Sequence, residues 1–313
     1  MSHPTYKHVI VVGIDGAGAF IKDADTPHFD RIFADGAVTY QALASNPTIS
    51  AECWGSMLLG VGPEVHKLTN GIVSSTPYPT DSPFPSLFRR IRDVMPDAEL
   101  GSYCDWNPIT YGIVESDRNV SSATARDSEL TPVICDYIRA KKPAFLFIQM
   151  DSVDGAGHGH GYGSEAHLRR IHEVDEYVDA IHKAAEDAGM LDETLFMVIA
   201  DHGGTPFNGT GAGHGGWTDA EKLVTFANYG WYVEMYLGML VMIPFLNAGW
   251  HGLSAAAKRT ALLGFLLLSG AHTIIPDRSL FDYWTALYPM PLPPTCRRTT
   301  ASGSRSWRAR QII

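Results

Sequence analysis

The sequence has few cysteines and no excess of basic residues. Its four cysteines are scattered over 313 residues without a Cys-x-x-Cys pair, so we expect them to be reduced and no disulfide framework to form. The net charge of -10 argues against the basic surface that nucleic-acid-binding proteins normally present. Small phosphorylated substrates stay possible, because a local metal site can override the overall charge.

The N-terminus lacks a basic segment followed by an apolar run and a small-residue cleavage site. An apolar, strand-like segment begins almost at once, at residues 7–12. We therefore expect no signal peptide, a cytoplasmic setting and no membrane association. The sequence leaves the oligomeric state open.

The composition is that of an ordinary globular protein, with 45% hydrophobic and 19% charged residues. Apolar β-branched runs predict strands at residues 8–13, 38–44, 144–150 and 195–200. Amphipathic or capped segments predict helices at residues 26–34, 50–59, 131–141 and 164–189. Residues 74–85 contain four prolines and are expected to be a loop. This alternation predicts an α/β fold with a central, largely parallel sheet and helices on both faces.

Three of these strands are followed by acidic residues. Asp15 follows the first, Asp151 and Asp154 follow residues 144–150, and Asp201 follows residues 195–200. A single aspartate after a strand is usually a turn residue or a helix cap. Three such strand ends, two with histidines close by in the sequence, indicate a ligand site at the carboxyl edge of the sheet.

The histidines complete a pattern typical of metal sites. Asp154 and His158 lie four residues apart in a glycine-rich segment, which predicts a turn. His202 follows Asp201 directly, and His214 stands in Gly-Ala-Gly-His-Gly-Gly. Carboxylate and imidazole ligands without thiolate suit zinc, and also manganese or iron. Sites of this composition are usually catalytic, because one coordination position stays open for water or substrate.

The order of these motifs resembles the nucleotide pyrophosphatase/phosphodiesterase branch of the alkaline phosphatase superfamily. The resemblance covers about residues 8–230. It rests on seven segments: Asp15-Gly16, residues 26–32, residues 47–50, Gly60 with residues 63–66, residues 154–158, residues 201–203 and residues 213–215. Each motif alone is weak, but seven in the same order are specific. The resemblance implies an alkaline phosphatase-like fold with two divalent metal ions, most simply zinc.

The resemblance also assigns the ligands. One metal ion would be held by Asp15, Asp201 and His202 together with the nucleophile. The second would be held by Asp154, His158 and His214. Sequence spacing identifies the nucleophile as Ser50, because the reactive hydroxyl of the family stands ten residues before the glycine at position 60.

Thr48 carries a second hydroxyl in the same segment and is expected to be a helix cap. A serine hydroxyl needs a base or a metal ion to become nucleophilic. The sequence lacks a Gly-x-Ser-x-Gly elbow, which argues against a catalytic triad on an α/β-hydrolase scaffold. Metal activation of Ser50 and a phosphoseryl intermediate follow as the hypothesis. A helix that starts at Ser50 would add backbone donors for anionic oxygens.

Other residues near these motifs receive structural interpretations. Asp151 is expected to cap a helix or to orient a ligand histidine, and His66 to have a structural role. Trp54 and Tyr162 are expected to pack in the core, with stacking on a flat leaving group as the alternative. In the family that the chain resembles, an asparagine three residues after the nucleophile helps to hold a phosphoryl oxygen. Cys53 stands at that position here, so Asn46 or a backbone N–H would have to replace it.

Residues 231–313 differ in composition from the catalytic domain predicted for residues 1–230. They contain three acidic residues against eight Lys and Arg, and apolar stretches too short to span a bilayer securely. A frameshift or gene-model error after Gly230 is the preferred explanation, and a membrane-associating appendage is the alternative. The end of the chain has the composition of disorder.

The sequence therefore predicts a two-metal hydrolase of phosphate esters, acting on phosphodiester or nucleotide pyrophosphate bonds through a phosphoseryl intermediate. A phosphomonoesterase or phosphonate hydrolase of the same superfamily is the first alternative. An inactive binding protein is the second, because of the atypical C-terminal segment. A sulfatase is disfavoured, because Ser50 does not stand in a Cys/Ser-x-Pro-x-Arg context.

Overall fold

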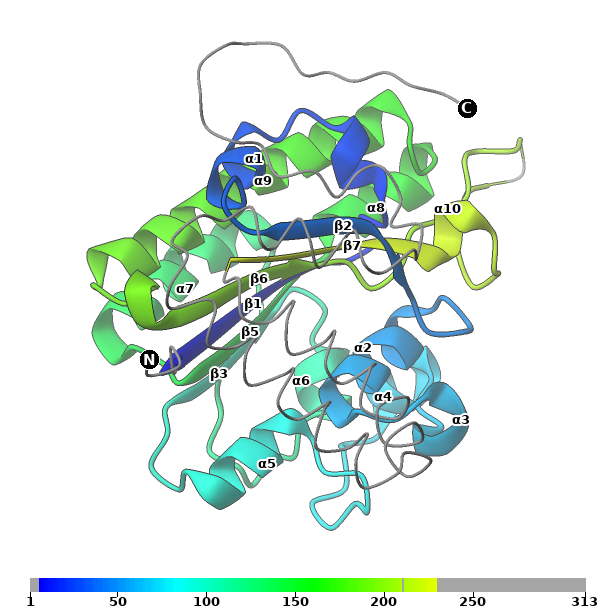
Figure 1. The fold of residues 1–313 in the computed structure, drawn as a ribbon. Helices are drawn as coiled ribbons and strands as arrows, with labels where there is room; N and C mark the ends of the chain where they lie inside the picture. The colour runs from blue at the N-terminus through cyan, green and yellow to red at the C-terminus, as the bar shows by residue number, and fades with distance from the viewer. Residues whose placement is uncertain (1–5, 210, 230–313) are drawn as a thin grey trace, which may run out of the picture. The chain divides into compact units, whose positions relative to one another are not determined.

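Seven strands form one mixed sheet in the computed structural model, which describes residues 6–209 and 211–229 (Figure 1). The strand order is β2-β7-β6-β1-β5-β3-β4. The bounds are β1 His8–Ile14, β2 Ala37–Leu43, β3 Leu100–Cys104, β4 Ser121–Ala123, β5 Phe145–Met150, β6 Thr194–Ile199 and β7 Leu223–Tyr229.

Strands β6, β1, β5, β3 and β4 are parallel, as the alternation of strands and helices predicted. Val11 in the central strand β1 pairs with Phe147 of β5 on one side and with Met197 of β6 on the other. β7 runs antiparallel to β6, and β2 antiparallel to β7, at one edge. The apolar runs of β1 and β5 suit strands buried on both faces of a sheet.

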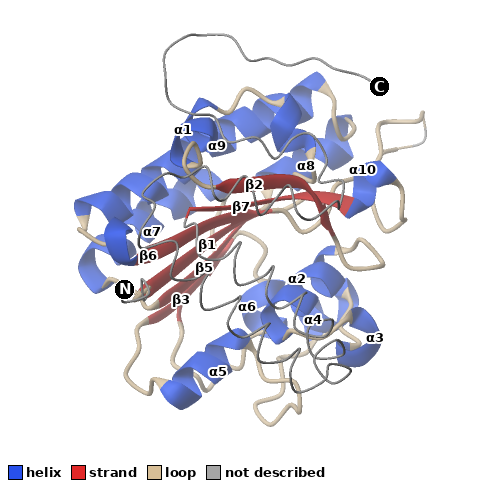
Figure 2. Cartoon of the chain, in the orientation of Figure 1, coloured by secondary structure: helices blue, strands red, loops and turns tan. Residues whose placement is uncertain are grey.

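Helices cover both faces (Figure 2). Helices α1, α7, α8 and α9 lie on one face, and α2 to α6 on the other. The bounds are α1 Pro27–Ile32, α2 Ser50–Leu59, α3 Pro63–His66, α4 Asn70–Ser75, α5 Leu87–Val94, α6 Pro108–Gly112, α7 Asp127–Lys141, α8 Ser152–His160, α9 Glu165–Asp187 and α10 Asp219–Lys222, with 3-10 turns at Phe20–Asp23 and Leu191–Glu193.

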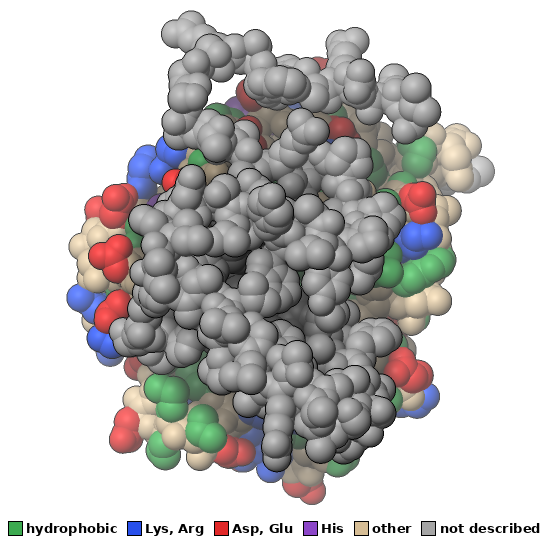
Figure 3. Space-filling view, viewed as in Figure 1, with side chains coloured by type: hydrophobic (Ala, Val, Ile, Leu, Met, Phe, Trp, Pro, Cys, Tyr) green, Lys and Arg blue, Asp and Glu red, His purple; other side chains and the backbone are tan. Residues whose placement is uncertain are grey.

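Each face of the sheet has its own apolar cluster. Val12 of β1 packs with Ile134 of α7 and Val174 of α9, whereas the neighbouring Val11 packs with Trp54 of α2 on the other face. This alternation follows from the two-residue repeat of a strand. Exposed ion pairs such as Arg139–Asp187, at 3.0 Å, contribute about 0–1 kcal/mol each, so the two clusters dominate stability. In Figure 3 the visible acidic and basic side chains of the described residues are interspersed.

The structure corrects one local prediction that concerns the site. The segment with Asp154 and His158 is not a glycine-rich turn but part of helix α8, Ser152–His160. Its glycines cost helix propensity, and tertiary packing overrides that cost: Gly157 is buried against Tyr162, where a Cβ would lie 2.4 Å from the ring. The helix places Asp154 and His158 four residues apart on one face.

The remaining predicted elements differ from the structure mainly in their ends. Helix α2 has the predicted bounds, and α7 begins at Asp127, four residues earlier than expected. The proline-rich loop begins after Ser75, because its first two residues belong to α4. Among the described residues, no helix is long and apolar enough to cross a membrane. The predicted tail, residues 231–313, lies outside the described residues.

Candidate active site

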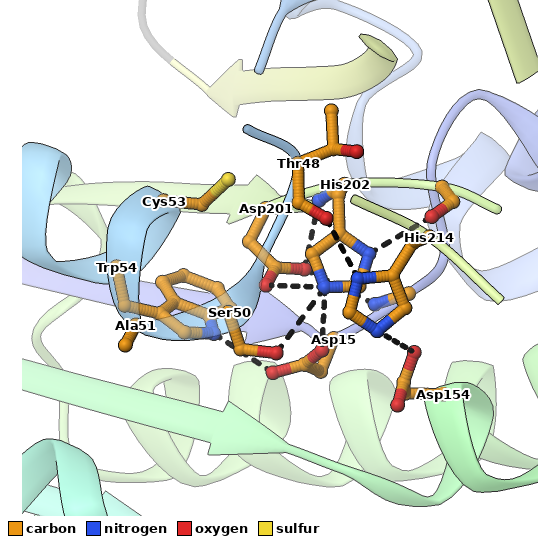
Figure 4. A network of polar contacts seen from close by, with 12 residues as sticks. Asp15, Thr48, Ser50, Ala51, Cys53, Trp54, Asp154, Asp201, His202 and His214 are labelled. Atoms are coloured by element: carbon orange, nitrogen blue, oxygen red, sulfur yellow. Dashed lines mark hydrogen bonds and ion pairs between the residues drawn. The ribbon is translucent and has the colours of Figure 1, made fainter. Parts of the chain in front are cut away.

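The sheet order brings the acidic strand ends together. β1 lies between β5 and β6, and all three strands are parallel, so their carboxyl ends meet at one edge. Asp15 follows β1 directly, Asp201 stands two residues after β6, and Asp154 lies in the first turn of α8, which follows β5. Figure 4 shows these side chains pointing toward one another.

Asp15, Asp201 and His202 form the first group of potential metal ligands. Their ligand atoms lie within 4.8 Å of one another, and all three side chains are buried. Nε2 of His202 lies 3.5 Å from Oδ1 of Asp15 and 3.3 Å from Oδ2 of Asp201. These are the three residues expected to share one metal ion.

The chemistry of this group fits a divalent cation. Oδ1 of Asp15 and Oδ2 of Asp201 are buried and have no hydrogen-bond partner. Nδ1 of His202 donates to the carbonyl oxygen of Gly203 at 2.9 Å, so in the neutral ring Nε2 is an acceptor that faces two carboxylate oxygens. An arrangement of acceptors facing one another is costly when buried, and a cation between them removes the cost.

The pKa shifts of these side chains are consistent with a cation between them. Burial and the charges of Asp201 and Asp154 raise the pKa of Asp15 well above its usual range. Burial likewise raises the pKa of Asp201, and burial lowers the pKa of His202. Oxygen and imidazole donors of this kind suit zinc, manganese or iron. The residues present therefore fit a divalent metal ion, and the donor set does not distinguish among these three.

Hydrogen bonds hold Asp15 in a fixed orientation. Its Oδ2 accepts from Nε1 of Trp54 at 2.8 Å and from Nε2 of Gln149 at 3.0 Å, which leaves Oδ1 directed at His202. Gly13 in β1 makes room for the indole, since a Cβ there would lie 2.4 Å from the Trp54 ring. Trp54 thus packs in the core, as expected, and is also a hydrogen-bond donor to the site.

Ser50 lies next to the same group. It is the first residue of helix α2, and its Oγ lies 3.2 Å from Nε2 of His202. The nitrogen that faces the two unpartnered carboxylate oxygens therefore also faces the hydroxyl. Cys53, one turn later on α2, is buried, and burial raises the pKa of its thiol well above the usual value. This environment disfavours Cys53 as a nucleophile.

The second group consists of Asp154, His202 and His214, whose ligand atoms also lie within 4.8 Å of one another. Nε2 of His214 lies 4.0 Å from Oδ1 of Asp154, and the His202 and His214 rings stack with centroids 3.8 Å apart. His158 does not belong to this group. Its Nε2 lies 3.2 Å from Oδ2 of Asp154, at a half-exposed position on the outer side.

Six of the seven residues named from the sequence thus lie in these two groups or, for Ser50, next to them, and His158 contacts Asp154 from outside. The division between the groups differs from the expected one. His202 is common to both groups, whereas the resemblance assigned it to one. Burial opposes ionisation of Asp154, but hydrogen bonding with His158 and the nearby His202 lower its pKa to about 2. Asp154 is therefore anionic at neutral pH.

Tyr162 orients Asp154. Its hydroxyl donates to Oδ1 of Asp154 at 2.5 Å, and its ring is buried between Gly157 and Gly204. A Cβ on either glycine would lie 2.4 Å from the ring. Tyr162 therefore packs as expected, and its hydroxyl fixes the carboxylate in addition.

Three residues around the site differ from their predicted roles or were missed. Thr48 does not cap α2; its hydroxyl donates to the Gly216 carbonyl at 3.0 Å. Asp151 precedes α8 but makes no side-chain cap bond, and instead accepts from Nε2 of Gln149 at 2.9 Å. Asn70 was missed: its Oδ1 accepts from the backbone N–H of Ala51, the residue after Ser50, at 3.0 Å.

No local sequence pattern identifies Asn70 or Gln149 as part of the site. Asn70 is twenty positions beyond Ser50, at the start of α4, and Gln149 is a polar residue inside the apolar strand β5. Gln149 could have been noticed as a buried amide that needs partners, but its partner Asp15 is far away in sequence. His66, in contrast, has the structural role expected: Nδ1 accepts from the Leu68 N–H at 3.0 Å.

Comparison with known proteins supports one family. The family model described as type I phosphodiesterase / nucleotide pyrophosphatase matches residues 74–238, more than half of the chain. A segment of 97 residues is 31% identical to GPI ethanolamine phosphate transferase 1 of Emericella nidulans, and covers 31% of this chain and 10% of that protein.

Solved structures share the fold at low sequence identity. Murine ectonucleotide pyrophosphatase/phosphodiesterase 5, in an inactive form in complex with AMP, is 20% identical with a TM-score of 0.54, over 65% of this chain and 59% of that chain. Phosphonate monoester hydrolase of Agrobacterium radiobacter is 12% identical with a TM-score of 0.52, over 71% of this chain and 68% of that chain. The chain thus spans about three fifths of the murine protein's length.

Proposed function

Because the chain belongs to the type I phosphodiesterase/nucleotide pyrophosphatase family, we propose that it cleaves phosphate esters with Ser50 as nucleophile. The proposed substrates are small phosphodiesters or nucleotide pyrophosphates. The proposed cofactors are two divalent metal ions, zinc before manganese or iron. Their proposed protein ligands are Asp15, Ser50, Asp154, His158, Asp201, His202 and His214.

One observation carries this proposal. The Ser50 hydroxyl oxygen, the unpartnered Oδ1 of Asp15 and the unpartnered Oδ2 of Asp201 lie 3.2, 3.5 and 3.3 Å from the same imidazole nitrogen. A nucleophile that approaches two buried, unpaired carboxylate oxygens needs positive charge beside it. Divalent ions held by these residues would lower the pKa of the Ser50 hydroxyl and neutralise developing charge on the phosphoryl group.

The residues of the chain would then act in two steps. In the first, Ser50 Oγ forms a bond to phosphorus as the bond to the leaving oxygen breaks; the serine proton is released and the leaving oxygen takes up a proton. In the second, water attacks the phosphoseryl ester, and Ser50 regains its hydroxyl proton. Asn70, whose Oδ1 accepts from Ala51, would offer its amide donors to a phosphoryl oxygen during both steps.

The test compares a diester with a monoester. The purified protein, loaded with zinc or manganese, is assayed with bis-p-nitrophenyl phosphate and p-nitrophenyl phosphate. We expect diester cleavage that EDTA abolishes and that the Ser50→Ala variant reduces by at least about a thousandfold. The matched control is Ser122→Ala, at an exposed position of β4, which leaves the rate unchanged.

Three outcomes would revise the assignment. A higher rate with the monoester, or with a p-nitrophenyl phosphonate, would replace the diesterase by the monoester or phosphonate hydrolase. Full activity in Ser50→Ala would reject the phosphoseryl scheme. Absence of both metal binding and turnover would favour an inactive binding protein.

Group transfer is a second candidate, favoured by the segment that is 31% identical to an ethanolamine phosphate transferase. The same phosphoseryl ester would react with an alcohol in place of water. Assays with increasing glycerol or ethanolamine distinguish the two activities. A phosphorylated acceptor formed at the expense of free phosphate or phosphomonoester would identify a transferase.

A further inference from the structure

Thr48 connects the nucleophile segment to the loop that carries His214, two parts of the chain that are 166 residues apart in sequence. Its side chain is buried, and its hydroxyl uses both of its hydrogen-bonding functions on this loop. It accepts from the Gly215 N–H at 2.9 Å and donates to the Gly216 carbonyl at 3.0 Å. The hydroxyl therefore holds the loop that carries His214 against the residues that precede Ser50.

The backbone of Thr48 sets the tautomer of His214. Nδ1 of His214 donates to the Thr48 carbonyl oxygen at 2.6 Å (Figure 4). A carbonyl oxygen can only accept, so Nδ1 carries the hydrogen and, in the neutral ring, Nε2 offers its lone pair. That nitrogen faces Asp154, 4.0 Å away, within the second group of ligands.

We propose that Thr48 is a positioning residue for the second metal ion, which it serves by fixing the ring orientation and tautomer of His214. The inference rests on the proposed two-metal function. Hydrogen bonds from the distal nitrogen of a metal-binding histidine to a carbonyl commonly orient the ligand and tune its basicity. Because Thr48 lies two residues before Ser50, the same residue sets the position of the second ion relative to the nucleophile.

The hydroxyl of Thr48 acts indirectly: it holds the loop in the position at which His214 reaches the Thr48 carbonyl. Thr48 is not the N-cap of α2; that position belongs to Ile49, which makes no side-chain cap bond. Gly215 has φ of +110° and lies against Ile49, so the loop follows an unusual path that the two hydroxyl bonds maintain. Without the hydroxyl, the Gly215 N–H and the Gly216 carbonyl lose these partners.

Three variants test the proposal. Thr48→Val keeps the shape of the side chain and removes the hydroxyl, Thr48→Ser keeps the hydroxyl, and His214→Ala identifies which binding event depends on the second group. Zinc stoichiometry is measured by elemental analysis and affinity by competition with a chromophoric chelator, independently of turnover. We expect Thr48→Val to weaken the second zinc ion about 10- to 100-fold and to leave the first unchanged.

Thr48→Ser is expected to retain wild-type affinity for both ions. The matched control is Thr194→Val, in which the buried hydroxyl donates to the Met190 carbonyl at 2.8 Å, at the start of β6. It should leave both affinities unchanged. Should Thr48→Val not fold, as judged by circular dichroism, Thr48→Ala removes the same hydroxyl with less bulk.

The outcomes separate this proposal from the function on which it rests. A wild-type protein that binds no zinc or manganese rejects the two-metal function itself. A wild-type protein with two ions and a Thr48→Val variant of equal affinity rejects the role of Thr48 alone. Equal losses in Thr48→Ser and Thr48→Val would also reject it, because the hydroxyl would not be the cause.

Discussion

The indole Nε1 of Trp54 donates a 2.8 Å hydrogen bond to Oδ2 of Asp15, and this bond joins the helix that begins with Ser50 to the end of the central strand. Trp54 is one helical turn after Ser50, on the same side of α2. The orientation of α2 and the orientation of the Asp15 carboxylate therefore depend on each other.

The first prediction concerns this bond. Trp54→Phe keeps an aromatic ring in the core and removes the donor, so that Oδ2 of Asp15 retains only Gln149. We expect affinity for the first divalent ion to fall about 10- to 100-fold, as for other partners of ligand side chains. Chelator competition measures the change.

Trp106→Phe is the matched control, because Trp106 packs against the same apolar cluster and its backbone N–H, not its ring, bonds to Gln149. Its metal affinity should equal that of the wild type. Similar losses in both variants would assign the effect of Trp54 to packing.

The second prediction concerns the unpaired carboxylates. In Asp201→Asn, the remaining oxygen can still accept from the Gly16 and His202 N–H groups, while an amide replaces the oxygen that has no partner. We expect the metal-free protein to become more stable, on the order of 1–3 kcal/mol, because a buried unsatisfied group is removed. Urea unfolding in EDTA measures this gain.

The same variant should gain less stability from zinc than the wild type does. Ligand binding to the folded state stabilises it by an amount that increases with the logarithm of the affinity, so the rise in Tm on adding zinc should be smaller in Asp201→Asn than in the wild type. Asp187→Asn, at an exposed position on α9, should change neither value. A less stable metal-free Asp201→Asn protein would contradict the interpretation of these oxygens as ligands.

The third prediction concerns pH. Burial, followed by the charge of Asp127, raises the pKa of Asp105 from 3.8 to about 7. Between these values the folded state keeps a proton that the unfolded state has lost. The stabilising contribution is therefore complete below about pH 4 and is lost as pH rises toward 7.

Asp105→Asn should flatten this part of the pH profile. The free energy of unfolding, measured with urea from pH 4.5 to 7.5 in EDTA, should fall less steeply with pH in the variant than in the wild type. The difference between the two profiles reports the titration of Asp105 together with its effect on the nearby Asp127 and Asp151. Parallel profiles would show that Asp105 does not titrate in this range.

The sequence alone predicted the parts of the fold that repeat a simple pattern. The apolar runs at His8–Ile14 and Phe145–Met150 identified central strands, and the aspartates that follow them identified the edge where the site lies. It did not predict β3, Leu100–Cys104, because Gly101 and Ser102 weaken the β-branched signal. It also could not show that β7 runs antiparallel to β6, since strand pairing depends on residues that are distant in sequence.

The sequence predicted which residues form the candidate site, but not how their side chains are arranged in space. Spacing placed Asp154 and His158 together, yet a helix rather than a turn achieves this, because burial of Gly157 under Tyr162 outweighs glycine's poor helix propensity. The supporting bonds from Trp54, Gln149 and Thr48 join residues far apart in sequence. Only the folded chain defines those partners.

The position of β1 between β5 and β6 has a consequence for how this centre can change over evolution. Neighbouring strands lie about 4.8 Å apart because of backbone hydrogen bonding. The sheet therefore fixes the distances between the segments that follow β5, β1 and β6. The backbone pairing that sets this spacing does not involve the side chains of Asp15, Asp154 and Asp201. In the proposed metal site, a single substitution can therefore change the ligand chemistry, whereas a change in the spacing between the ligands requires a different order of strands.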